Sequence, residues 1–268
     1  MPLFRIKKAT PSETLRIEGF RRCDEDILAW YRSEPGRRVV EVLRPVVAEA
    51  IVEAFGYHAL CLCPGAGMPD LLADARIAHR VHMSEFPPPV DVQGNRHELP
   101  FAGESLDLVV LFHTLDTAAD PHAVLREVDR VLRPEGHLLL IGFQPLSLFS
   151  LAYLCRRSCT RGLRCGRHYT ARRVRDWLSL LGYAVDDTVP LAHALPLCGA
   201  GALDRLEFVE NLGRRLWPAF GGLYVLHGIR RVRPLLPRRP AWARPMVMPQ
   251  GAPSPTTRSC LRDREPIR

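Results

Sequence analysis

The chain has 268 residues, of which 47% are hydrophobic and 25% charged, and its net charge is +8. These fractions are close to globular averages, so they predict one main folded domain with appendages. The positive charge favours acidic partners or substrates, such as nucleic acid, anionic metabolites or lipid headgroups.

Secretion and membrane insertion are both disfavoured. The start of the chain has no continuous apolar segment after its basic residues, so no secretory signal peptide is expected. The most lipid-like run, 137–155, is interrupted by Gly142, Gln144 and Pro145, whereas a membrane span needs about 20 mainly apolar residues. The eight cysteines are scattered in a chain too long to need disulfides. We therefore expect a soluble, cytoplasmic protein.

Strand and helix patterns alternate through the middle of the chain, which predicts a parallel sheet covered by helices on both faces. A helix over 39–55 leads into a strand over 57–63, and a second helix is expected over 68–75. Residues 79–84 and 89–94 are weaker strand candidates. The first half of the sheet is therefore expected to precede residue 95.

The strongest strand signal is the nearly continuous apolar run 105–112, which is typical of a central parallel strand buried on both faces. Asp120 and Pro121 form an N-cap and first-turn pair for the next helix. "RPEG" is expected to end that helix, before a strand over 137–143.

The last elements are a helix and two strands. Thr170 is expected to cap a helix over 171–181, and Gly182 suits the left-handed position that ends it. Residues 183–189 and 221–232 are predicted to complete the sheet as an antiparallel pair.

Composition divides the chain into three parts. Residues 1–35 are charged and mixed, and we interpret them as an N-terminal extension forming a short helical lid. Residues 36–233 are the main domain, with a basic Cys/Arg-rich loop at 156–170 and an insertion at 190–220. Residues 234–268 are rich in Pro and Arg with little clustered apolar surface, so they predict a disordered tail.

Residues 98–143, "ELPFAGESLDLVVLFHTLDTAADPHAVLREVDRVLRPEGHLLLIGF", resemble the class I S-adenosylmethionine-dependent methyltransferases, in particular the methyltransferase type 11 group. Later segments resemble a bacterial branch of that group, so the resemblance covers about residues 40 to 232. It implies an α/β, Rossmann-like, doubly wound sheet of seven strands, mostly parallel with an antiparallel last strand. S-adenosyl-L-methionine is then expected across the carboxyl ends of the strands, where strand order reverses.

The first cofactor loop of the family reads like "LDLGCGTG", and residues 60–67 read "LCLCPGAG". Gly65 and Gly67 match the two later glycines, which permit positive φ and a close approach of backbone to ligand. Cys61 stands where the family has an acid that helps to hold the cofactor's amino group, and Cys63 stands where it has its first glycine. The resemblance therefore implies a modified cofactor site.

Further site residues follow from the same resemblance. Glu85 is the candidate for the acid that accepts hydrogen bonds from the ribose hydroxyls, although an ordinary loop acid is an alternative. In "GNRHELPF", Asn95 stands at the position of an Asp beside the adenine, followed by Arg96, and an amide oxygen can still accept from the adenine amino group. Phe112 and His113 occupy positions that line the cofactor and face the substrate.

His113 is the candidate catalytic residue. Its ordinary pKa of about 6.5 suits a general base if the acceptor must lose a proton, but a buried structural histidine is equally consistent. Methyl transfer depends mainly on the alignment of nucleophile, methyl carbon and sulfur, so no catalytic dyad need be visible.

The segment after residue 154 combines soft ligands with positive charge. Cys155, Cys159, Cys165 and His168 match no common zinc spacing, so no metal site is predicted. The strongest local charge cluster comprises Arg156, Arg157, Arg161, Arg164, Arg167, Arg172, Arg173 and Arg175. It favours an anionic acceptor or RNA, with a solvated basic face as the plainer alternative.

The sequence thus predicts a methyltransferase that acts on an O, N or C nucleophile of a small-molecule acceptor. Two alternatives stay open: a methyltransferase-like fold kept as a binding or regulatory module, and an RNA-directed methyltransferase. Cys61 and Cys63 support the former, and the arginine cluster supports the latter. The same fold serves many acceptors, so the sequence names none.

Overall fold

A computed structural model of the chain describes residues 11–88, 90–145, 166–186, 188–191 and 221–231, with side chains from residue 18 onward. The described residues belong to one compact unit, Met1–Val232. The predicted tail, most of the predicted insertion and most of the predicted Cys/Arg-rich loop lie outside the described residues.

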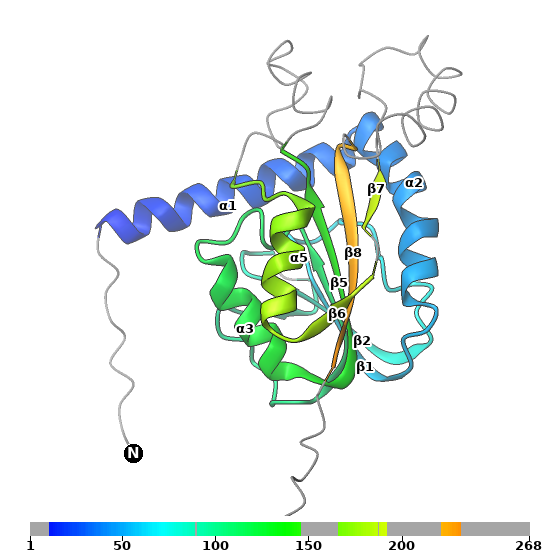
Figure 1. Cartoon of the computed structure of the whole chain (residues 1–268). Helices are drawn as coiled ribbons and strands as arrows, with labels where there is room; N and C mark the ends of the chain where they lie inside the picture. The colour runs from blue at the N-terminus through cyan, green and yellow to red at the C-terminus, as the bar shows by residue number, and fades with distance from the viewer. Residues whose placement is uncertain (1–10, 89, 146–165, 187, 192–220, 232–268) are drawn as a thin grey trace, which may run out of the picture. The chain divides into compact units, whose positions relative to one another are not determined.

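A mixed eight-stranded sheet forms the centre of the unit (Figure 1). The strand order is β3-β2-β1-β4-β5-β8-β6, and β7 pairs with β8. β1 to β5 are parallel, and β8 runs antiparallel to β5, β6 and β7. The strands are β1 (Gly56–Leu62), β2 (Ile77–Ser84), β3 (Val92–Gln93), β4 (Leu106–Phe112), β5 (Leu132–Phe143), β6 (Tyr183–Val185), β7 (Val189–Leu191) and β8 (Leu223–Arg230).

The expected α/β, Rossmann-like architecture is confirmed, including the antiparallel strand that completes a mostly parallel sheet. Eight strands are present rather than seven, because the three-residue β7 pairs separately with β8. Strand order reverses between β1 and β4, and in open α/β sheets such a reversal leaves a crevice at the carboxyl ends of the strands.

Helices cover both faces of the sheet. They are α1 (Pro11–Arg32), α2 (Glu34–Ile51), α3 (Pro121–Val131) and α5 (Ala171–Leu180). Alternate residues of the fully buried β4 point into two separate cores: Val110 packs in the core that contains α2, and Val109 in the core that contains α3 and α5. Figure 1 shows α1 running across the end of the sheet toward which β5 points.

The predicted helix caps are confirmed. The Asp120 carboxylate accepts hydrogen bonds from the backbone N–H groups of His122 at 3.0 Å and Ala123 at 3.2 Å. Thr170 caps α5 through the backbone N–H of Arg173 at 3.3 Å. Gly182 ends α5 with a positive φ of 90°. These signals are local, so they predict correctly without knowledge of the tertiary structure.

Two predicted elements are wrong in place or kind. The expected helix over 68–75 is absent, and bends and turns lie there instead. Pro69 lacks a donor N–H, and the Asp70 carboxylate accepts a hydrogen bond from Leu72 N at 2.9 Å, which favours a turn. Arg80 then donates to the carbonyl of Leu72 at 2.9 Å. The strand predicted to start at residue 137 starts at Leu132, because α3 ends before "RPEG".

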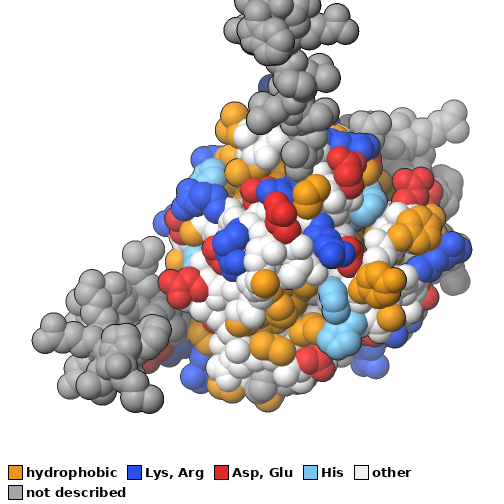
Figure 2. All heavy atoms as spheres, turned by 90° about the horizontal axis from the view of Figure 1, so that it is seen from below, with side chains coloured by type: hydrophobic (Ala, Val, Ile, Leu, Met, Phe, Trp, Pro, Cys, Tyr) orange, Lys and Arg blue, Asp and Glu red, His pale blue; other side chains and the backbone are white. Residues whose placement is uncertain are grey.

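The surface at the opposite end of the sheet mixes apolar, basic and acidic side chains (Figure 2). Phe55 and Tyr57, which lie around the start of β1, are among the most exposed large hydrophobic residues. Within the described residues, no helix is long and apolar enough to cross a membrane.

Candidate active site

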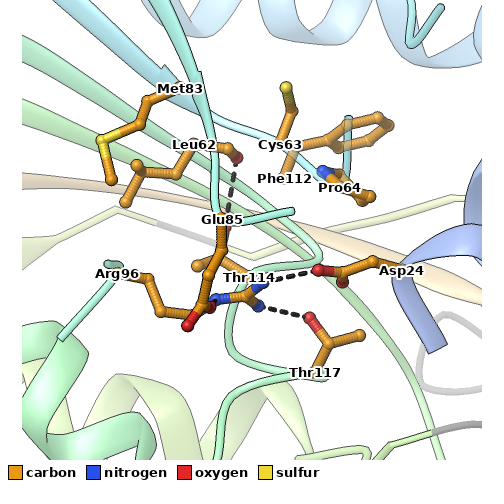
Figure 3. Close-up of a pocket in the computed structure, with 10 residues that line it drawn as sticks. All are labelled: Asp24, Leu62, Cys63, Pro64, Met83, Glu85, Arg96, Phe112, Thr114 and Thr117. Atoms are coloured by element: carbon orange, nitrogen blue, oxygen red, sulfur yellow. Dashed lines mark hydrogen bonds and ion pairs between the residues drawn. The ribbon is translucent and has the colours of Figure 1, made fainter. Parts of the chain in front are cut away.

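A small hollow lies at the carboxyl ends of β1, β2 and β4, beside the reversal of strand order (Figure 3). The empty space in it is about 230 Å³. Strand ends and the turns after them supply most of its walls, and α1 supplies one residue. The lining residues are Asp24, Leu62, Cys63, Pro64, Met83, Glu85, Arg96, Phe112, Thr114 and Thr117.

A largely buried ionic cluster forms part of the wall of the hollow. The Arg96 guanidinium donates to Asp24 Oδ2 at 2.5 Å, to Thr117 Oγ1 at 2.6 Å and to the Glu85 carboxylate. Asp24 comes from α1, whereas Glu85 directly follows β2. Figure 3 shows the guanidinium lying between these partners.

The ionic cluster shifts the ionisation of its members. Burial lowers the pKa of Arg96, but the charges of Asp24 and Glu85 more than offset this and raise it overall. Burial raises the pKa of Asp24 above its usual value, although Arg96 opposes the rise. Asp24 Oδ1 is buried and accepts no hydrogen bond from the described residues. The Asp24 carboxylate is therefore only partly compensated for its loss of water.

A second polar network surrounds His113, which directly follows β4 and is fully buried. His113 Nε2 lies 2.7 Å from the Tyr31 hydroxyl, and Nδ1 lies 2.9 Å from Asp116 Oδ2. Phe143 stacks on the imidazole with ring centroids 3.9 Å apart, and its backbone N–H donates to Asp116 at 3.1 Å. His168 Nδ1 lies 3.6 Å from Asp116 Oδ1.

The backbone of His113 is unusual, with a φ of 54°. A non-glycine residue held in this region costs of the order of 1–3 kcal/mol, and such residues cluster at functional sites. Burial lowers the pKa of His113, and Asp116 only partly opposes the shift. Burial would raise the pKa of Asp116, but its hydrogen bond to His113 and the nearby His168 lower it overall. The network therefore favours neutral His113 beside ionised Asp116.

The comparisons with known proteins agree with this geometry. Residues 55–140 match the methyltransferase-domain family. The fold matches a solved SAM-dependent methyltransferase from Thermotoga maritima with a TM-score of 0.55 at 16% identity, over 80% of this chain and 99% of that one. The chain therefore has the fold of class I methyltransferases, and its residues 55–140 match a methyltransferase domain. The predicted resemblance is thereby confirmed, and the family match and fold indicate S-adenosylmethionine as the cofactor.

Two curated relatives match over stretches longer than residues 55–140. Uncharacterized protein YafS of Escherichia coli (strain K12) is 41% identical over 109 residues, which are 41% of this chain and 45% of YafS. Demethylmenaquinone methyltransferase of Mycobacterium tuberculosis is 29% identical over 178 residues, 63% of this chain and 68% of that protein. The match to YafS thus spans less than half of the length of that protein.

The methyltransferase domain brings several of the predicted cofactor residues together. Cys63, Glu85, Arg96 and Phe112 all line the hollow, and the Gly65–Gly67 turn adjoins it through Pro64. Two other predicted residues lie elsewhere, as does the candidate base His113.

Those two residues are Cys61 and Asn95, which do not line the hollow. Cys61 is buried in the core that contains α2. The Asn95 side chain accepts a hydrogen bond from His97 N at 2.8 Å, so it stabilises its own turn. Each therefore has a structural role in the arrangement described.

The turn after β1 is held by contacts on both sides. Cys63 N donates to Met83 O at 3.0 Å, and Arg32 of α1 donates to Ala66 O at 2.9 Å. Gly67 has a φ of 92°, which favours glycine. Bends and turns follow over residues 68–75, so the turn is not continued by a helix whose N-terminus could face a ligand.

The residues around the hollow fit the chemistry of S-adenosylmethionine. The Glu85 carboxylate suits ribose hydroxyls, and Leu62, Met83 and Phe112 offer apolar surface. The hollow is much smaller than typical ligand pockets of roughly 300–1,000 Å³. Asp24 and Arg96 both line it, and their side chains are joined by a hydrogen bond of 2.5 Å.

Sequence reasoning missed four residues of these networks: Asp24, Tyr31, Asp116 and Thr117. Asp116 and Thr117 follow His113 closely in "HTLDT", so that spacing could have indicated them. Asp24 and Tyr31 belong to α1 and have no comparable signal, because their partners lie 72 and 82 residues away in the sequence. Among the described residues, no group of three or more His, Cys, Asp or Glu is placed to hold a metal.

Proposed function

We propose that this protein is an S-adenosylmethionine-dependent methyltransferase that acts on a small-molecule acceptor in the cytoplasm. One observation carries the proposal: a hollow at the strand-order reversal of a methyltransferase domain, with Glu85 at the end of β2. When bound, the cofactor would supply a methyl group attached to a sulfonium. The sulfonium is a good leaving group because it becomes a neutral thioether.

Each side of the hollow has a distinct task in this proposal. Glu85 accepts hydrogen bonds from the ribose hydroxyls, while Gly65 and Gly67 let the backbone approach the methionine part. Arg96 takes the place beside the adenosine that the family resemblance implies for Asn95, because the Asn95 side chain is engaged in its own turn. Alignment of acceptor and methyl carbon is then the main contribution of the protein.

His113 is proposed as the base for an acceptor that carries a proton on its nucleophilic atom. When the acceptor takes the methyl group that the bound cofactor would supply, its proton would move to His113 Nε2. Nε2 faces the Tyr31 hydroxyl, so an acceptor must replace that contact. Asp116, 2.9 Å from Nδ1, then stabilises the imidazolium.

The acceptor class is best sought among quinone-like and anionic small molecules. The mycobacterial relative is a demethylmenaquinone methyltransferase, which supports aromatic quinol acceptors. The net charge of +8 supports anionic ones.

The test is transfer of tritium from methyl-labelled S-adenosylmethionine to a panel of demethylated quinols, phenolic acids and RNA. We expect label in one small-molecule class, with S-adenosylhomocysteine formed in equal amount. His113→Ala should slow an acceptor that needs deprotonation by about 10²-fold or more. His79→Ala, which alters an exposed histidine of β2, is the matched control. A full-length, folded protein that binds cofactor but methylates nothing would contradict the proposal.

One observation favours a binding or regulatory module instead. The turn after β1 lacks both the family's acid and a following helix, and the hollow is small. Cofactor binding without turnover on any acceptor would support that function.

RNA as acceptor draws less support from the described arginines. Arg175 donates to Thr188 Oγ1 at 2.9 Å, and Arg173 lies 5.4 Å from the centre of the Trp177 ring. Salt-sensitive RNA binding, followed by RNA methylation, would restore that alternative.

A further inference from the structure

The proposed function raises the question of how a cofactor enters a hollow that is small and has a side chain of α1 in its wall. Resting on that function, we propose that α1 is a lid, that Asp24 is the latch which holds it on Arg96, and that cofactor binding requires this latch to open. Loss of the latch is then expected to strengthen cofactor binding, which is the opposite of what loss of a binding residue would do.

α1 closes the carboxyl end of the sheet through several kinds of contact. Asp24 reaches Arg96 inside the hollow, Tyr31 reaches His113, and Arg32 reaches the Ala66 carbonyl. These partners follow β3, β4 and β1 respectively. One helix therefore covers three of the turns that surround the hollow, so its position controls access to all of them.

The contact between Asp24 and Arg96 competes directly with a ligand. Asp24 and Arg96 both line the empty space, and their side chains are joined by a hydrogen bond of 2.5 Å. Arg96 also holds Glu85, the carboxylate proposed to accept the ribose hydroxyls. When α1 is closed, the Arg96 guanidinium lines the empty space and also binds Glu85, the carboxylate proposed to accept hydrogen bonds from the ribose hydroxyls.

Of the partners of Arg96, Asp24 is the one suited to leave the cluster. Its burial is only partly compensated, because Oδ1 accepts no hydrogen bond from the described residues. When Asp24 returns to water, Arg96 keeps its bonds to Glu85 and to Thr117 Oγ1. Opening α1 therefore hydrates one carboxylate without leaving the guanidinium unpaired.

A closed α1 lowers the apparent affinity of the protein for the cofactor. A ligand that binds only the open form has its apparent affinity reduced by the fraction of molecules that are open. Minor conformations of this kind are populated at about 0.1–10%. Removing the latch should therefore tighten cofactor binding by about tenfold or more.

The experiment compares Asp24→Asn with Glu25→Gln in the full chain. Both changes remove one negative charge from neighbouring positions of α1, but the Glu25 side chain is 56% exposed and pairs with Arg21 on the surface. Calorimetric titration with S-adenosylhomocysteine measures affinity. Hydrogen exchange of residues 19–32 without ligand measures the opening of α1 independently of the cofactor.

The latch predicts faster exchange of α1 in Asp24→Asn and binding that is tighter by about tenfold or more, with Glu25→Gln like the wild type. Unchanged or weaker binding by Asp24→Asn, when the wild type binds, overturns the latch and leaves the proposed function intact. Unchanged exchange of α1 overturns it as well. Faster exchange of α1 with no cofactor binding by any of the three proteins supports the latch as the closure of the hollow and contradicts the proposed function.

Discussion

The turn after β1 and the segment after β4 meet at the same edge of the sheet, yet they are built in different ways. The turn takes its shape from backbone: Gly67 has a positive φ, and Asp70 bonds to a nearby N–H group. The segment after β4 takes its shape from buried side chains, with His113 and Asp116 joined at 2.9 Å. Thr114 links the two regions through a 3.1 Å hydrogen bond to the Leu62 carbonyl.

This contrast shows why the two regions differ in their likeness to the family. A backbone-shaped turn can keep its glycines while its side chains change, as Cys61 and Cys63 have. A side-chain network requires every partner to stay, and here two partners come from α1. The chemistry of the site is therefore expected to depend on the N-terminal helix as much as on the glycine turn.

The largest effect is expected from Arg96→Met, which leaves the carboxylates of Asp24 and Glu85 facing each other without a cation. The free energy of unfolding should fall by about 3–5 kcal/mol, as measured by urea denaturation. Arg126→Met, which removes an exposed arginine 3.9 Å from Asp120, should cost less than about 1 kcal/mol. A loss of similar size in the two variants would show that the buried cluster does not stabilise the fold.

Tyr31→Phe tests the network after β4. The change removes the 2.7 Å partner of His113 Nε2 and leaves that nitrogen buried without it. The free energy of unfolding should fall by about 1–3 kcal/mol. Tyr57→Phe removes a hydroxyl from a side chain that is 72% exposed, and should change stability by no more than about 0.5 kcal/mol. Equal effects would mean that the His113 contact contributes nothing.

Gly67→Ala tests the backbone of the turn after β1. At a φ of 92° the new Cβ should cost about 1–2 kcal/mol of unfolding free energy. Gly19→Ala in α1, where nothing lies within 4 Å of the added Cβ, should instead stabilise by about 0.5–1 kcal/mol. Changes of the same sign in both variants would contradict a turn that depends on glycine conformation.

The smallest effect concerns pH. Because burial lowers the pKa of His113, the unfolded chain binds more protons than the folded one between about pH 6.5 and that lowered value. Stability from this group is therefore present above about pH 6.5 and is lost as the pH falls through the folded pKa.

His113→Gln should flatten this fall, with His79→Gln as the exposed control. The relevant measurement is the free energy of unfolding at steps between pH 7 and pH 5, and one proton contributes at most about 1.4 kcal/mol per pH unit. Identical slopes in wild type and His113→Gln would show that His113 does not remain neutral when buried.

The sequence predicted those features whose signals are local. Asp120 and Thr170 cap their helices within three residues, and the apolar run that forms β4 can only be buried. The helix expected after Gly67 failed because Pro69 and the Asp70 turn outweigh the apolar spacing. The local signals are therefore sound where no nearby side chain offers the backbone a competing partner.

The candidate site was less predictable, because its contacts are long-range. Family resemblance pointed to Glu85 and Arg96, and both line the hollow. It could not indicate that Asn95 turns back on its own loop, nor that Asp24 and Tyr31 complete the networks from α1. Such pairings depend on where a distant helix packs, which residue spacing does not encode.

The most direct test of the account is calorimetric titration of the full chain with S-adenosylmethionine and S-adenosylhomocysteine. Wild type and a Gly65→Val, Gly67→Val double variant are compared, with circular dichroism to show that both are folded. Glu85→Gln serves as a second variant should the double variant unfold. We expect both ligands to bind the wild type with micromolar affinity, the double variant not to bind them, and Glu85→Gln to bind them more weakly. Absence of binding to folded wild type, or binding that none of these changes affects, would contradict the account.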